Sequence, residues 1–84
     1  MSSNNHMARE PRALTRAKAI QKFLLDWEAT SRAMACNKRD ILLHVTTEGK
    51  RFSAKSFTVA MKAAREHGIT ITRSGRSLYW TPDV

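Results

Sequence analysis

Between residues 50 and 76 the chain carries cationic, small polar and small apolar side chains of the kinds that contact nucleic acid. Lys and Arg neutralise phosphates, Ser and Thr hydroxyls bond phosphates or base edges, and small apolar groups pack against thymine methyls. Ten positions combine these types: Lys50, Arg51, Lys55, Ser56, Thr58, Val59, Lys62, Ala63, Arg73 and Arg76. The pattern predicts a DNA-binding surface.

A predicted helix over residues 53–67 holds six of these ten positions. Residues at the i, i+3, i+4, i+7 spacing of a buried helix face are Phe57, Ala60, Met61 and Ala64. The residues that then point away from the core are Lys55, Val59, Lys62 and Glu66, flanked by Ser56, Thr58 and Ala63. We expect Ser53 as the N-cap, Phe52 and Phe57 as a hydrophobic staple around it, and Gly68 after the helix end.

A β-hairpin is expected to follow this helix over residues 69–80. Two alternating runs of β-branched, aromatic and polar residues flank Ser74-Gly75, a pair suited to a two-residue turn. The expected pairs on the apolar face are Ile71 with Leu78 and Ile69 with Trp80. Arg73 and Arg76 then flank the turn at the exposed tip, where they can reach phosphates.

The N-terminal half predicts two further helices. Pro11 suits the first turn of a long helix, and the chain is expected to break near Thr30 and Ser31. The apolar stripe of that helix comprises Leu14, Ala17, Ile20, Leu24 and Trp27, with Phe23 at its edge. Asn37 is placed to cap a short second helix that ends near Thr46, and residues 47–51 form a turn into the third helix. Residues 1–9 are expected to be a disordered tail before one domain over residues 10–84, and the His6-Met7 junction resembles an expression remnant ahead of a start at Met7.

The composition excludes several classes of protein. Fifteen Lys and Arg against seven Asp and Glu give a net charge of +8, which favours a polyanionic partner. A lone Cys36, no secretory segment and no apolar run of about 18 residues predict a cytoplasmic protein, nucleoid-associated in a bacterial cell, with no membrane contact. His6, His44 and His67 lack metal-ligand spacing, so we expect no metal, no cofactor and no catalytic residues.

The predicted order of elements resembles the winged helix-turn-helix superfamily over residues 11–80. Within it, two stretches are similar to the C-terminal winged-helix module of phage and plasmid primase-helicases: residues 53–62 with His67-Gly68, and residues 73–80. Such modules often continue with a Gly-Ile-like step where this chain has Thr81-Pro82, so only nucleic-acid binding is carried over. The resemblance implies an α+β winged helix-turn-helix fold, with three helices before a two-stranded antiparallel wing, the third being the recognition helix.

Two classes of function remain open at this point. The first is a small, non-enzymatic double-stranded DNA-binding protein, such as a phage or mobile-element regulator of transcription or replication, acting as a monomer or homodimer. The second is a protein-interaction module, such as a phage-encoded inhibitor of a host protein, that presents Val59 and basic residues to an acidic surface. RNA binding is less favoured because Tyr79 is the single candidate stacking platform.

Overall fold

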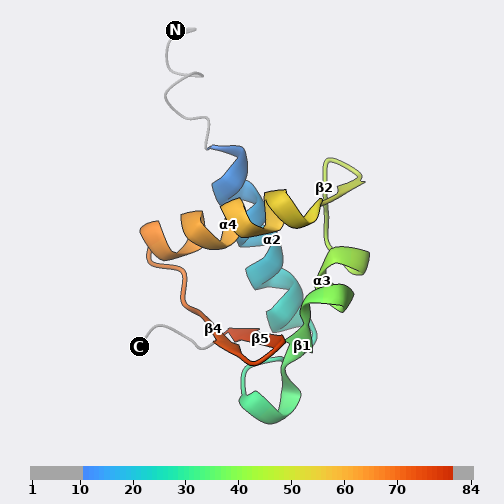
Figure 1. Ribbon diagram of the computed structural model, residues 1–84, viewed down its shortest axis with the longest axis vertical. Coiled ribbons are helices and arrows are strands. Elements are labelled where there is room, and N and C mark those ends of the chain that lie inside the picture. The colour runs from blue at the N-terminus through green and yellow to red at the C-terminus, as the bar shows by residue number, and fades with distance from the viewer. Residues whose placement is uncertain (1–10, 81–84) are drawn as a thin grey trace, which may run out of the picture.

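The computed structural model describes residues 11–80, and the predicted tail over residues 1–9 lies outside that range. The chain forms an α+β domain in which three α-helices precede the longest β-hairpin (Figure 1). The elements are α2 (Arg12–Asp26), the 3-10 helix η1 (Arg32–Met34), β1 (Cys36–Asn37), α3 (Lys38–His44), β2 (Thr46–Thr47), β3 (Lys50–Arg51), α4 (Ala54–Glu66), β4 (Ile71–Ser74) and β5 (Ser77–Trp80).

Helix α2 buries the predicted stripe only up to Leu24, and it ends earlier than expected. The expected break near Thr30 was wrong by about one turn, because Glu28 adopts a left-handed conformation (φ 54°). The N–H of Ala29 then donates to the carbonyl of Leu24 (2.7 Å), which closes the helix in a Schellman motif. Trp27, predicted on the buried stripe, is 49% exposed. A glycine at position 28 would have predicted the helix end from the sequence, whereas Glu28 does not.

Helix α4 begins and ends as its sequence predicts. Ser53 caps it by accepting a hydrogen bond from the Ser56 N–H (3.1 Å), and Phe52 and Phe57 on either side of the cap are both buried. Gly68 follows the helix with φ +75°, a left-handed conformation that glycine adopts without steric strain. Helix α4 crosses α2, and these two helices form the largest interface of the fold (Figure 1).

The hairpin after α4 forms with a different register from the predicted one. The observed pairs are Ile71 with Trp80, Thr72 with Tyr79, Arg73 with Leu78 and Ser74 with Ser77. The turn therefore consists of Gly75 and Arg76, one residue later than expected, and Ile69 lies before the strand. Gly75 has φ +60° and Arg76 does not, which matches a type II′ turn with glycine in its first central position. Because the pairing shifts by two residues, Ile71, Leu78 and Trp80 still share one face.

The sheet has a third strand that the sequence analysis did not predict. Strand β1 pairs antiparallel with β5, Cys36 opposite Leu78 and Asn37 opposite Ser77, so the strand order is β1-β5-β4. Asn37 also caps α3 as predicted, since its Oδ1 accepts from the Asp40 N–H (2.8 Å). A two-residue strand is too short to show the alternation by which strands are recognised. The expected two-stranded sheet is therefore three-stranded.

The link between α3 and α4, predicted as a simple turn, is a second hairpin. Thr46 pairs with Arg51 and Thr47 with Lys50. Glu48 and Gly49 between them have φ values of 53° and 76°. Two consecutive positive φ values define a type I′ turn, whose twist matches that of the strands it joins.

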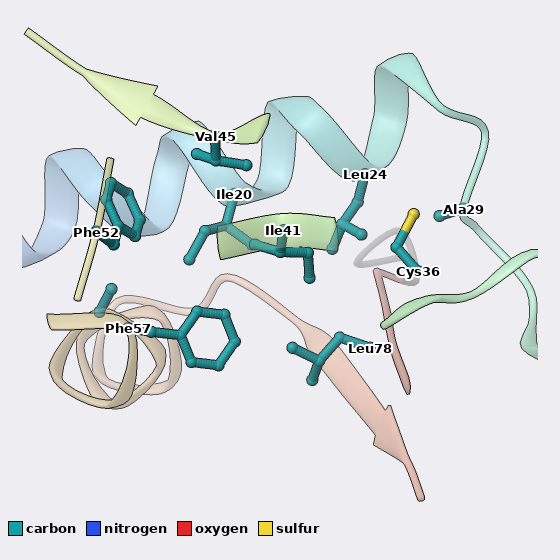
Figure 2. Packing of buried hydrophobic residues seen from close by; sticks show 10 residues of the cluster. Ile20, Leu24, Ala29, Cys36, Ile41, Val45, Phe52, Phe57 and Leu78 are labelled. Atoms are coloured by element: carbon teal, nitrogen blue, oxygen red, sulfur yellow. The ribbon is translucent and has the colours of Figure 1, made fainter. Parts of the chain in front are cut away.

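The core joins all three helices to strand β5 (Figure 2). Ile41 of α3 is fully buried and lies in the middle of this cluster, between α2 and the side chains of Phe57 and Leu78. Trp80, expected opposite Ile69, is partly buried against the same cluster, and its backbone N–H donates to the carbonyl of Ala29 (3.2 Å). The hairpin is thus attached both to the core and to the chain that follows α2.

Candidate functional site

A basic groove lies between α4, the first turn of α3 and the β4–β5 hairpin. Its volume is about 970 Å³. The residues that line it are Asn37, Lys38, Arg39, Phe57, Thr58, Met61, Lys62, Arg65, Ile71, Arg73, Arg76, Ser77 and Leu78. Six of these thirteen residues are cations and none is acidic. We refer to this feature below as the basic groove.

The unpredicted strand β1 brings the start of α3 to the groove. Because Asn37 lies opposite Ser77, the next residue of the chain, Lys38, is placed beside the turn of the β4–β5 hairpin. The Lys38 N–H lies 3.4 Å from the carbonyl oxygen of Arg76 and donates to it. The cations of α3 and of the hairpin therefore share one wall of the groove, although they are almost forty positions apart in the sequence.

Helix α4 lines the groove with one of its flanks. Thr58, Met61, Lys62 and Arg65 stand at the i, i+3, i+4, i+7 spacing and face the groove. Phe57 and Leu78 are buried beneath them, and the Lys38 Nζ lies 5.2 Å from the centroid of the Phe57 ring. At this distance a cation is attracted to the ring face, which holds Lys38 over an apolar base.

The charges of the groove have no counterpart among the described carboxylates. Within residues 11–80, none of the six groove cations forms an ion pair, whereas Lys22 pairs with Asp26 (2.9 Å) on the exposed side of α2. The uncharged polar groups are largely engaged in local hydrogen bonds. Thr58 Oγ1 donates to the Ala54 carbonyl (3.2 Å), and the Asn37 oxygen caps α3. The donors that remain for a ligand therefore belong mainly to Lys and Arg.

The structure brings four of the ten predicted site residues into the groove, namely Thr58, Lys62, Arg73 and Arg76. Lys55 and Val59 are exposed on α4 but do not line the groove, and Lys50 and Arg51 belong to the β2–β3 hairpin. Ser56 is half-buried, and its hydroxyl accepts a bond from the Ser53 hydroxyl (3.2 Å). The remaining position, Ala63, was expected at the surface but is only 7% exposed.

Three cations of the groove, Lys38, Arg39 and Arg65, were missed by the sequence analysis. Arg65 could have been found, because it lies seven residues after Thr58 and three after Lys62 on the same flank of the predicted helix. Lys38 and Arg39 could not, because their place depends on the pairing of β1 with β5. The groove-facing flank of α4 is thus rotated from the outward face predicted from its apolar stripe.

Cys36 and His44 are titratable side chains outside the groove, and each packs against other residues of the fold. Burial, and to a lesser extent the charge of Asp40, raises the pKa of the Cys36 thiol above its ordinary value, so it is protonated at neutral pH. His44 packs against the rings of Phe23 and Trp27. Among residues 11–80, no three His, Cys, Asp or Glu side chains are close enough together to hold a metal ion.

Comparison with known proteins adds no assignment to this geometry. No family model, curated protein or solved structure matches the chain. In the part of the chain that the structure describes, every helix is too short or too polar to cross a membrane.

Proposed function

We propose that the chain is a winged-helix protein that binds double-stranded DNA through the basic groove. In this assignment α3 and α4 are the helix pair, α4 is the recognition helix and the β4–β5 hairpin is the wing. The observation that supports it most directly is the set of six cations and no acid around one groove. Phosphate neutralisation by Lys and Arg supplies most of the affinity in non-specific binding.

The arrangement of the groove suits a duplex backbone beside an inserted helix. Lys62 and Arg65 of α4 line the same groove as Arg73 and Arg76 of the hairpin, so a phosphate strand in the groove would meet cations from both elements. An α-helix fits into the major groove, where α4 would present Thr58 toward base edges. The groove itself suits a single strand less well, since Phe57, the one aromatic residue that lines it, is buried and cannot stack on a base.

We expect duplex affinity to fall steeply with salt, because each neutralised phosphate releases a counterion. If all six groove cations contact phosphates, log K against log salt has a slope of about −5. Fluorescence anisotropy with a labelled 20-base-pair random duplex between ~50 and 200 mM salt measures it. Heparin and excess unlabelled duplex are then compared as competitors. A difference between the concentrations at which they displace the labelled duplex separates duplex binding from binding to any polyanion. No binding at ~50 mM salt would exclude the proposed function.

A protein-interaction module is the second candidate, and Val59 is the exposed side chain on which it depends. Val59 is 48% exposed on α4 outside the groove, where it serves neither the core nor the cationic surface. The same exposed position can contact a thymine methyl in a major groove or an apolar pocket on a protein. The two candidates therefore make opposite predictions for this side chain.

Val59→Ser is expected to leave folding and non-specific duplex binding unchanged, since it removes no charge and no buried group. It should weaken binding to a preferred site, obtained by selection from random duplexes, by about 1 kcal/mol or more if Val59 contacts a thymine methyl. Val59→Ile, which keeps the apolar contact, is the matched control. Unchanged affinity for every duplex, together with loss of a protein partner in a pull-down, would favour the interaction module instead.

A further inference from the structure

A second cationic surface lies at the other end of the recognition helix. Lys50 and Arg51 are exposed on the β2–β3 hairpin, and neither lines the basic groove. The hairpin leads through Phe52 and Ser53 directly into the first turn of α4, where Lys55 is also exposed. Figure 1 shows β2 beside the N-terminal end of α4, whereas the β4–β5 hairpin follows its C-terminal end.

This hairpin is held in place by its neighbours. Its type I′ turn and its two residue pairs define its shape, β2 packs against α2, and β3 packs against α3. At its base, Phe52 is buried, and the guanidinium of Arg16 lies 5.7 Å from the centroid of that ring. Lys50 and Arg51 are therefore presented from a defined position relative to α4, and not from a free loop.

Measured along α4, the two cationic surfaces are separated by nearly the width of a major groove. Lys55 and Lys62 are seven residues apart, which is roughly 10 Å along an α-helix. The major groove is about 12 Å wide between its bordering backbones. When the cations around Lys62 contact one backbone, the hairpin beside Lys55 lies near the opposite one.

We infer that the β2–β3 hairpin contacts the second phosphate backbone, so that the protein clamps both strands bordering one major groove. This inference rests on the proposed function, and it assigns Lys50 and Arg51 a role that the groove does not include. The partner it requires is a duplex, since a single strand offers one backbone only.

Glu48 provides an independent test of the same contact. It is the one acidic residue between β2 and β3, and it is exposed next to Gly49 in the turn. A carboxylate close to a phosphate backbone repels it. Removal of this charge should therefore strengthen binding if the hairpin lies on DNA, and should have no effect if it does not.

The experiment compares Lys50→Ala/Arg51→Ala with Lys18→Ala/Lys22→Ala, a control that removes the same charge from the exposed side of α2. We expect the hairpin variant to lower the magnitude of the duplex salt slope by about two, and the control to leave it within about half a unit. The loss should be larger for a duplex than for a single strand of the same length, because only the duplex offers the second backbone. Glu48→Gln should tighten duplex binding by roughly two- to fivefold.

The possible results distinguish a failure of the two-strand contact from a failure of the proposed DNA binding. If the unchanged protein fails to bind duplex DNA, the proposed function is wrong. If it binds, but the hairpin variant and Glu48→Gln both behave like wild type, DNA binding is retained as the function and the contact of the β2–β3 hairpin with a second backbone is wrong. Equal losses on duplex and single strand would also overturn the clamp, since they would show a contact with one backbone.

Discussion

Lys62→Glu should weaken duplex binding on the order of 10- to 100-fold at ~100 mM salt, the largest loss expected from any single substitution in the groove. In the proposed complex the change removes one phosphate contact and places a carboxylate in the groove that Arg73 and Arg76 also line. Both effects act on the same bound strand. Anisotropy titrations at three salt concentrations measure the loss.

Lys22→Glu is a closely matched control. It makes the same change in net charge on an exposed helix position, and it places the new carboxylate four residues before Asp26, just as Lys62→Glu places one four residues before Glu66. Any helix destabilisation from an i,i+4 acidic pair is therefore common to both variants, and the exposed Lys22–Asp26 ion pair that the control also loses contributes little to stability. Charges more than about 10 Å from the ligand are largely screened at this salt, so the control should change affinity by less than about threefold. Similar losses in both would mean that net charge, and not the groove, determines binding.

The elements of the fold were predictable where local chemistry defines them. Ser53 and Gly68 mark the ends of α4 by cap chemistry, and Asn37 marks the start of α3, so these boundaries were confirmed. The end of α2 was missed because Glu28 adopts the left-handed conformation that sequence patterns assign to glycine or asparagine. Local signals therefore predict an element well only when the residue type itself prefers the required backbone.

The register of the β4–β5 hairpin shows a second limit. Ser74-Gly75 and Gly75-Arg76 are both acceptable turn pairs, and both sort Ile71, Leu78 and Trp80 onto one face. The apolar pattern cannot separate registers that differ by two residues. The pattern also does not show the long-range contacts of β5, which pairs with β1 and donates from the backbone N–H of Trp80 to the Ala29 carbonyl.

The candidate site was predictable only in part for the same reason. Its α4 and hairpin cations come from two predicted elements that are neighbours in sequence, and all of them except Arg65 were identified, namely Lys62, Arg73 and Arg76. Lys38 and Arg39 come from a different element that reaches the groove only through the β1–β5 pair. A two-residue strand has no periodicity, so no reading of this one sequence places them there.

Ile41→Ala should cause the largest loss of stability, about 2 to 5 kcal/mol out of the 5 to 15 typical of a small domain. Ile41 is 0% exposed and projects from α3 into the centre of the cluster, toward side chains of α2, α4 and β5 (Figure 2). Truncation leaves a cavity that three surrounding elements cannot all close. Urea unfolding, followed by tryptophan fluorescence and circular dichroism, measures the change.

Leu43→Ala on the same helix separates burial from the loss of a large aliphatic side chain. Leu43 is 51% exposed, so its truncation should change the free energy of unfolding by no more than about 0.5 kcal/mol. Because α3 also carries Lys38 and Arg39, Ile41→Ala should shift DNA binding only through the unfolded fraction, and affinity per folded molecule at low temperature should equal that of wild type. Equal destabilisation by the two substitutions would show that Ile41 does not anchor α3. A lower affinity per folded molecule would instead show that the packing of Ile41 sets the position of the groove wall.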